Sequence, residues 1–244
     1  MEDPIYIPLL SKEDDELEEE IKTNIKNKIH KGFIWKIFCI LLYQLTITSL
    51  MVIISMTSST INEFIRSNNI VYFAAIIISI TCILLSLCSP VLYKKVPSNY
   101  IILTIFTICN GYLISSLTII SNPLNVTVAF ILTFVTVITL TIYAWKSETD
   151  FTIYGGVLCS FLAMLVIGSL IMIFFTVSLI VLIIYICLSL SLAFYLVYDV
   201  QLLIGNKRNK FDEEDYILAT INLYLDIVNI FINLLKLINI IRSD

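Results

Sequence analysis

The sequence predicts an all-α integral membrane protein, and its bulk composition carries that prediction. The 244 residues have a mean hydropathy of +0.95, and 59% of them are hydrophobic. Only 14% are charged, whereas soluble globular proteins carry roughly 25% charged residues. The apolar residues form long continuous runs, which favour membrane helices over the short alternating strands of an outer-membrane barrel. This composition excludes a soluble globular protein.

Six strong apolar runs follow one another, and each is long enough for one span, because a helix needs about 20 mainly apolar residues to cross a core of roughly 30 Å. A seventh run is as long but carries Asp226, Lys236 and several asparagines, so it either spans fully or re-enters. Together the runs predict a multi-pass membrane domain over residues 33–244. They cover residues 33–56, 70–93, 100–120, 126–145, 153–175, 177–204 and 216–241.

Residues 1–32 form the only sizeable segment outside the runs. Nine acidic residues within the first 20 precede a basic stretch, and Leu17, Ile21, Ile25 and Ile29 recur every four residues. That spacing suits a short amphipathic helix on the membrane surface, with its lysines toward anionic headgroups. A solvated, disordered tail is the alternative. The segment lacks the pattern of a cleaved signal peptide, so we expect the first run to act as an uncleaved anchor.

Lysine and arginine gather in alternate loops, and basic residues are retained on the cytosolic side of a membrane. The tail, Lys94 and Lys95, Lys146 and three basic residues between runs six and seven fall on one side. The other side has only Arg66 and, after the seventh run, Arg242. The N-terminus is therefore predicted to be cytosolic, and the C-terminus is lumenal if the seventh run spans fully.

Cofactor and modification signals are weak. All six cysteines fall inside the runs, and their spacing indicates neither a disulfide framework nor a zinc site. We therefore expect no cofactor. Residues 125–127 form a glycosylation sequon on the predicted lumenal side, but it abuts the fourth run, so we expect Asn125 to be unmodified.

Asp199 and Asp226 are the only acids inside the hydrophobic runs. A charged residue at the centre of a membrane helix costs at least about 2.5–3.5 kcal/mol, so such residues usually face a protein interior or a water-filled path. Asp226 shares one helix face with other polar residues, at alternating spacings of four and three. These are Asn222, Asn229, Asn233 and Lys236, and the three asparagines are candidate pore-lining residues.

The sixth run offers a second polar line, in which Ser191, Tyr195 and Asp199 recur every four residues. Tyr195 is a further pore-lining candidate. A short loop joins runs six and seven, so the two helices are expected to be antiparallel neighbours with their aspartates at comparable depths. Two carboxyls in contact in a poorly hydrated site cannot both ionise easily, so they should share a proton. Deprotonation would separate them and create oxygen ligands for a transient hard cation such as calcium.

The two acids are also compatible with two roles that involve no ion path. Each carboxyl could be protonated and bonded to a neighbouring helix, with no conduction. An intramembrane aspartyl protease also uses two membrane aspartates, and Tyr198-Asp199 resembles its first motif. Its second aspartate sits in a Gly-x-Gly-Asp setting with a Pro-Ala-Leu segment nearby, and this chain has neither around Asp226. We therefore expect no enzyme.

The C-terminal third closely resembles the signature of the transmembrane Bax inhibitor motif family, and within it the Lifeguard and Golgi anti-apoptotic protein branch. The likeness extends over everything after the first 30 residues. It is carried by residues 198–205 (YDVQLLIG), 214–219 (EDYILA) and 222–229 (NLYLDIVN), with support from 35–38 (WKIF), 44–45 (QL), 150–152 (DFT) and 155–156 (GG).

The resemblance implies a seven-helix bundle, with six spans around a semi-polar C-terminal helix, in Golgi, endoplasmic reticulum or related membranes. It also implies a pH-sensitive calcium leak that lowers store calcium and inhibits apoptosis. Asp199 and Asp226 match the family's aspartate pair, and Glu214 with Asp215 matches the acidic start of its last helix.

Two departures from the family pattern concern the pair. Val200 stands where a threonine is usual, which removes a hydroxyl, and Lys94 and Lys95 come later than the basic residues that latch an aspartate in the family. They remain candidate latches.

The expected function is a calcium leak channel, with calcium, the bilayer and other anti-apoptotic or calcium-release membrane proteins as partners, and no nucleic acid. A non-conducting adaptor that inhibits cell death through protein partners is the alternative. A proton-coupled transporter is a third.

Overall fold

The computed structural model describes residues 7–161, 178–205 and 214–242, and within these ranges it is helical with no strand. The all-α prediction is therefore confirmed. The elements in chain order are α1 (Ile7–Thr57), α2 (Ser59–Ser67), α3 (Asn69–Cys88), α4 (Pro90–Lys94), α5 (Ser98–Thr118), α6 (Pro123–Lys146), the 3₁₀ helix η1 (Phe151–Tyr154), α8 (Ser178–Ile204) and α9 (Tyr216–Arg242).

Six of the described helices are long and apolar enough to cross a membrane, namely α1, α3, α5, α6, α8 and α9. They correspond to six of the seven expected runs. Of the run expected at 153–175, only the part up to 161 belongs to an apolar helix that the structure describes, which begins at Phe151. The remainder of that run lies outside the described residues.

Prolines set the ends of two helices. The second run was expected to reach residue 93, but α3 ends at Cys88, and the separate short helix α4 begins at Pro90. A proline disfavours helical backbone in the residue before it, and Ser89 adopts φ −140° and ψ 65°. Pro123 likewise occupies the first turn of α6, where Asn122 caps the helix by accepting from the amide of Leu124.

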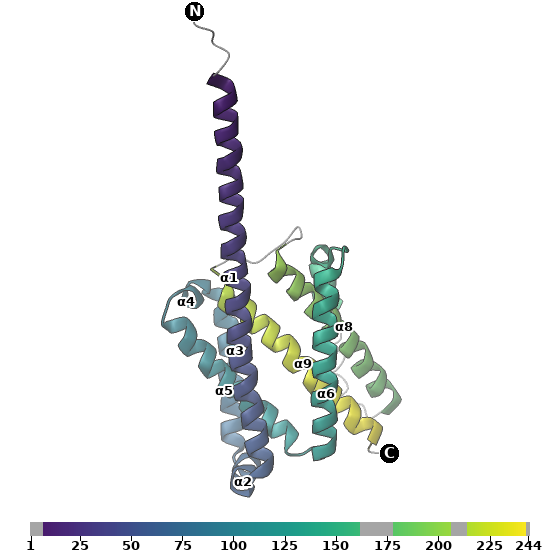
Figure 1. Cartoon of the computed structure of the whole chain (residues 1–244). Helices are drawn as coiled ribbons and strands as arrows, with labels where there is room; N and C mark the ends of the chain where they lie inside the picture. Colours follow the sequence, from purple (N-terminus) through teal and green to yellow (C-terminus); the bar gives the residue numbers. More distant parts are fainter. Residues whose placement is uncertain (1–6, 162–177, 206–213, 243–244) are drawn as a thin grey trace, which may run out of the picture.

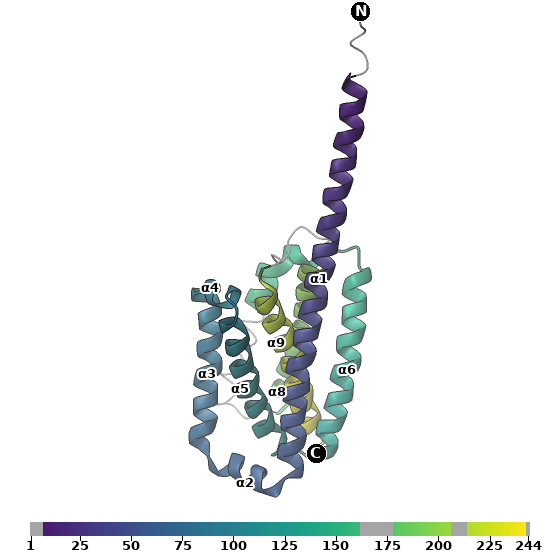
Figure 2. The same cartoon turned by 60° about the vertical axis from the view of Figure 1, so that its left-hand side comes forward.

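Helix α9 lies at the centre of the bundle and packs against α1, α5, α6 and α8 (Figures 1 and 2). It is the most buried of the six candidate spans. Its 27 residues form one continuous helix, about 40 Å long at 1.5 Å per residue. It therefore crosses the bundle from the end at which α1 projects, here called the tail end, to the opposite, distal end.

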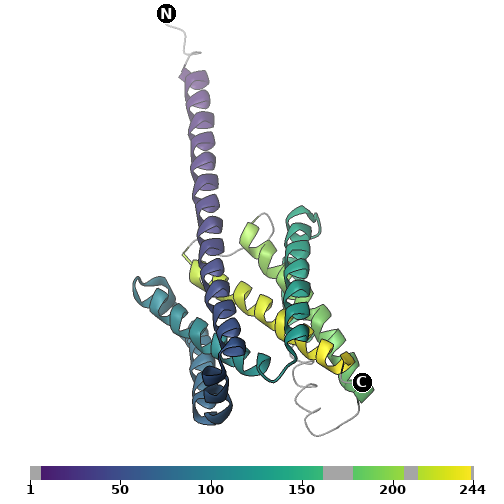
Figure 3. The ribbon, with the colours of Figure 1, turned by 60° about the horizontal axis from the view of Figure 1, so that its bottom comes forward.

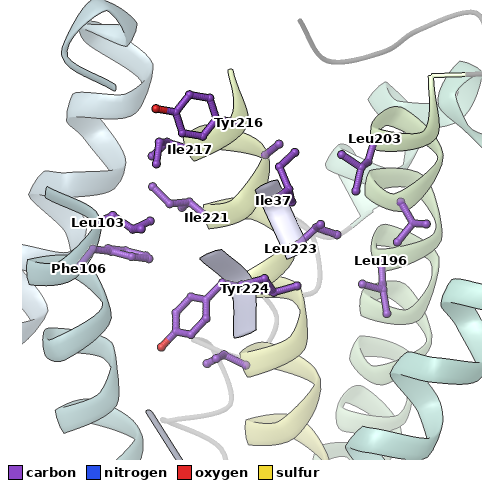
Figure 4. Close-up of a cluster of buried hydrophobic side chains, with 14 of the residues drawn as sticks. Ile37, Leu103, Phe106, Leu196, Leu203, Tyr216, Ile217, Ile221, Leu223 and Tyr224 are labelled. Atoms are coloured by element: carbon purple, nitrogen blue, oxygen red, sulfur yellow. The ribbon is translucent and has the colours of Figure 1, made fainter. Parts of the chain in front are cut away.

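The core forms where α9 meets α1, α5 and α8 (Figure 4). Ile37, Leu103, Phe106 and Tyr224 are all at most 1% exposed. Helices α1 and α5 come close because Gly111 has no side chain; a Cβ there would lie 2.6 Å from the sulfur of Met51. Close approach through small residues is the usual way in which membrane helices associate.

The tail is helical and continues into the first span without a break, so α1 projects well beyond the other helices (Figures 1 and 3). It therefore lies in line with the span rather than across it. The two tryptophans, Trp35 on α1 and Trp145 at the end of α6, are 73% and 63% exposed. Tryptophan is enriched at membrane–water interfaces, so these side chains indicate the level of the interface at the tail end.

Asn125 of the sequon is expected to carry no glycan. It is 7% exposed, and its amide is already engaged, donating to Asn239 Oδ1 at 2.8 Å and accepting from Arg242 at 3.0 Å. A sugar on that nitrogen would break this network. Wild type and Asn125→Gln, expressed in eukaryotic cells, should migrate identically on gels before and after glycosidase treatment; a shift confined to wild type would contradict the expectation.

Candidate functional site

The candidate site lies where α8 and α9 pack together, and the sequence explains how they meet. Helix α8 ends at Ile204 because Gly205 adopts φ 70°, a left-handed conformation that glycine accepts without steric cost. The Gly205 amide donates to the carbonyl of Gln201 at 3.2 Å. Both helices carry an aspartate on the face that meets the other.

The structure brings Asp199 and Asp226 together. Their side chains are hydrogen-bonded to each other, and the two residues are 4% and 7% exposed. A carboxylate can only accept hydrogen bonds, so this contact requires one of the two carboxyls to carry a proton and donate it. The Oδ2 atom of Asp226 is buried and has no partner among the described residues. The contact therefore leaves one buried oxygen with spare acceptor capacity.

Apolar side chains enclose the pair. Leu196 and Leu203 lie one turn to either side of Asp199 on α8, and each is 1% exposed. On α9, Leu223 and Ile230 flank Asp226 in the same way and are 2% and 4% exposed. Figure 4 shows Leu196, Leu203 and Leu223 between the two helices. The carboxyls are thus shielded from water by apolar side chains.

The polar stripe expected on α9 divides between two environments. Asn233 is buried and donates to Ser189 Oγ at 2.8 Å and to the Tyr185 carbonyl at 3.1 Å, so it joins α9 to α8. Asn222 and Asn229 are exposed. Lys236 is half-buried, with Nζ 5.7 Å from the centroid of the Tyr185 ring. Spacing alone grouped these residues, but their contacts separate them.

Tyr195 contacts the segment that follows η1. It is hydrogen-bonded to Cys159, and its ring lies 5.9 Å from that of Tyr198. Tyr198 in turn packs on Gly155, where an added Cβ would lie 2.7 Å from the Tyr198 hydroxyl. These contacts hold the face of α8 next to Asp199 against the segment that follows η1.

Gln201 is an anchoring residue that sequence reasoning missed. It is 1% exposed, donates to the Thr149 carbonyl at 2.9 Å and accepts from the Phe151 amide at 2.8 Å. It thereby ties the start of η1 and the residue Thr149 before it to α8, two residues after Asp199. The signal that could have identified this residue was the presence of a glutamine inside an otherwise apolar run.

Glu214 and Asp215 lie at the tail end, where they meet Lys94 of α4. The Lys94 Nζ is 3.2 Å from Asp215 and 3.5 Å from Glu214. The latch expected between a lysine and the aspartate pair is therefore not formed by Lys94, which binds the acidic start of α9 instead; for Lys95 the described structure gives no ion pair. The reason is position, because Lys94 follows the break at Ser89 and so lies beyond the end of α3.

Further contacts hold the start of α9 and the end of α8 at the tail end. Asn99 donates to the Tyr216 hydroxyl at 2.8 Å, and Lys36 Nζ lies 3.3 Å from the centroid of the Tyr216 ring. His30 Nε2 is 2.7 Å from the carbonyl of Ile204, the last residue of α8. Helix α1 therefore contacts both helices that carry the aspartates.

Comparison with known proteins agrees with this architecture. Residues 30–243 match the family described as "Inhibitor of apoptosis-promoting Bax1", and that match covers far more than half of the chain. The chain belongs to the Bax inhibitor-1 family. The resemblance inferred from the C-terminal motif is thereby confirmed.

Members of the Bax inhibitor-1 family from animals and plants resemble the chain over most of its length. Protein lifeguard 3 of Mus musculus is 30% identical over 221 residues, covering 86% of this chain and 70% of that protein. Protein LIFEGUARD 3 of Arabidopsis thaliana is 34% identical over 216 residues, covering 86% and 85%. Protein LIFEGUARD 2 of Arabidopsis thaliana is 33% identical over 217 residues, covering 87% and 89%.

Membership in the Bax inhibitor-1 family supports three statements. The chain is a multi-pass membrane protein embedded in a lipid bilayer. The family consists of non-enzymatic membrane proteins, which confirms the expectation that this chain is not an enzyme. Membership also implies an anti-apoptotic role.

Among the residues that the structure describes, no group of three or more His, Cys, Asp or Glu side chains gathers as a metal site.

In this Bax inhibitor-1 family protein, Lys94→Ala should loosen the start of α9, whereas Lys95→Ala should not. The hydrogen bond to Asp215 raises the pKa of Lys94 above its ordinary value. Lys94 therefore stays charged throughout the physiological pH range. It loses its charge, and with it its ion pairs, only as pH rises through that raised pKa. Hydrogen exchange of the first amides of α9 should be faster in Lys94→Ala, with Lys95→Ala as the matched control. Equal exchange in both variants would contradict this role.

Proposed function

We propose that this protein is a pH-sensitive calcium leak channel of Golgi, endoplasmic reticulum or related intracellular membranes, which lowers store calcium and thereby inhibits apoptosis. Asp199 and Asp226 act as its proton-sensitive gate and transient ion site. Glu214 and Asp215 lie at its cytosolic mouth. The observation that carries the proposal is the hydrogen-bonded carboxyl pair buried between α8 and α9.

The shared proton supplies the pH sensitivity. While it is present, one carboxyl donates to the other and the two helices stay together. When it leaves, two carboxylates face each other in apolar surroundings, where their repulsion is weakly screened. The helices then separate, water enters, and leak increases. Lower pH therefore favours the closed pair and higher pH the open one.

Calcium fits the chemistry of the open pair. It is a hard cation that binds carboxylate, carbonyl and water oxygens, usually six to eight of them. Two aspartates supply only part of such a shell, so water completes it and binding stays weak enough for the ion to leave. Exposed acid at the tail end, with Glu214 79% exposed, raises the local cation concentration.

The proposed orientation places the tail end in the cytosol. It rests on the lysines of the tail and of the loops at that end. Because α9 runs continuously from Tyr216 to Arg242, this orientation puts the C-terminus in the lumen. The acidic mouth then faces the cytosol, and calcium leaves the store through the bundle.

A non-conducting adaptor, acting on other anti-apoptotic or calcium-release membrane proteins, is the competing function. The enclosure of the pair by leucines favours it, because the described side chains that flank the carboxyls on α8 and α9 are buried and apolar. In the channel proposal the same enclosure is the closed gate, since apolar constrictions block ions by excluding water. Flux measurements separate the two functions.

The test is calcium release from liposomes that contain the purified protein and an indicator dye, measured over a series of pH values on both sides of neutral. The channel predicts flux above that of empty liposomes, rising with pH and not saturating with calcium. Flux that saturates and follows an imposed proton gradient would indicate a proton-coupled transporter. Absence of flux at every pH would overturn conduction and leave the adaptor.

A further inference from the structure

The part of α1 before Gly32 carries an apolar row with no protein partner in the described structure. All described side chains of residues 15–25 and 27–29 are exposed, and this part of the helix stands clear of the bundle (Figure 3). An isolated helix gains most of its stability from burying its apolar face, so this row requires a partner. The row consists of Leu17 (58% exposed), Ile21 (50%), Ile25 (54%) and Ile29 (52%).

Residues 21–31, here called the docking segment, have the arrangement of a helix that lies in a membrane surface. At 100° per residue, Lys22 and Lys28 lie about 60° to either side of Ile25, and both are exposed. Thr23 and Asn27 occupy the opposite face. The segment contains no acidic residue. An apolar centre flanked by lysines, with neutral polar residues behind, matches an anionic bilayer surface.

The residues before the docking segment set its outer limit. Residues 13–20 contain seven acids and no base, so an anionic surface repels them. Glu18 is paired with Lys22 at 2.7 Å, which neutralises one of the acids within a helical turn of the docking segment. Contact with the membrane therefore begins at about Ile21, where the sign of the charge changes.

Gly32 supplies the bend that docking needs. It is the only glycine in α1, and a Cβ there would meet nothing within 4 Å, so close packing does not explain its presence. Glycine weakens a helix and is a common site of bending. Trp35, three residues later, marks the interface, so the docking segment starts at headgroup level. It is already tethered to the membrane, which makes its binding intramolecular.

We propose that the docking segment bends at Gly32 onto the cytosolic surface of its own membrane and binds anionic lipid headgroups. The Ile21, Ile25 and Ile29 side chains enter the acyl boundary, and the lysines contact phosphate. Bending moves His30 away from the Ile204 carbonyl, so docking releases one contact between α1 and the end of α8. This proposal does not depend on calcium conduction.

The test uses the full chain in nanodiscs, either wholly zwitterionic or with about 30% phosphatidylserine. Hydrogen exchange of amides 21–31 should be about tenfold slower in the anionic discs, and added salt should reverse the slowing. Equal exchange in the two lipids would overturn the proposal. Slowing that requires two protein copies in one disc would also overturn it, because the partner would then be a second copy of α1.

Variants separate docking from general helix stability. Ile25→Asn combined with Ile29→Asn removes two of the three isoleucines of the docking segment but keeps every lysine, and it should abolish the lipid-dependent slowing. Thr23→Asn, on the opposite face, should leave the slowing intact. Gly32→Ala should reduce it by stiffening the bend. Slowing that survives the double isoleucine variant would contradict insertion of the row.

Discussion

Replacing Asp226 by asparagine is expected to lower calcium flux at neutral pH by about tenfold or more and to flatten its pH dependence. The asparagine amide can donate to Asp199 at every pH, so the closed contact no longer needs a proton. The repulsion that opens the wild-type pair is also lost; two charges about 4 Å apart interact by ~4 kcal/mol at an effective dielectric constant of about 20. Liposome flux across pH measures both effects.

Asp199→Asn should act in the same direction, because it removes the other charge of the same pair. The double variant should be little worse than either single variant, since both changes remove one interaction. Glu63→Gln is a matched control: Glu63 is an exposed acid on α2, and its loss should leave the pH profile unchanged. An unchanged profile in Asp226→Asn would show that the pair is not the gate, whereas additive losses in the double variant would show that the two aspartates titrate independently.

The spans could be predicted from sequence because crossing a membrane is a property of each helix alone. Length and hydropathy suffice for that purpose. The seventh run stayed ambiguous because its polar residues oppose insertion in lipid, and only the neighbours of α9 show how its acid is accommodated. Asp226 is enclosed by Leu223, Ile230 and the facing side of α8, so α9 crosses the bundle without presenting this acid to lipid.

Contacts between helices were harder to predict because spacing gives a face but not its neighbour. Asn229 and Asn233 share one face of α9, yet Asn229 is exposed while Asn233 bonds to α8. Lys94 was a candidate for binding the aspartate pair, but the helix break at Ser89 brings it to Asp215. Such pairings depend on how distant segments pack, and no local pattern encodes them.

A second large effect is expected at Tyr224, which joins α9 to two other helices. It is 0% exposed, its hydroxyl is 2.9 Å from Thr48 Oγ1 on α1, and its ring meets Phe106 of α5 edge-on at 6.0 Å. Tyr224→Ala should destabilise the folded protein by about 3 kcal/mol, because truncating a buried aromatic leaves a cavity that neighbouring helices fill incompletely. Packing is the main force between helices in lipid.

Two comparisons resolve the origin of that effect. Tyr224→Phe keeps the ring and removes only the bond to Thr48, so it should cost about 1 kcal/mol. Tyr72→Ala makes the same truncation at a tyrosine that is 38% exposed on α3, and it should cost under about 0.5 kcal/mol. Unfolding of the purified protein in detergent, followed against denaturant, provides the measurement. A similar loss of stability from Tyr224→Ala and Tyr72→Ala would mean that the packing of Tyr224 does not stabilise the bundle. Other contacts of α9 would then have to hold Asp226 in position. A larger loss of stability from Tyr224→Ala, with Tyr224→Phe close to wild type, would show that the Tyr224 ring, packed between α1 and α5, holds α9 in place.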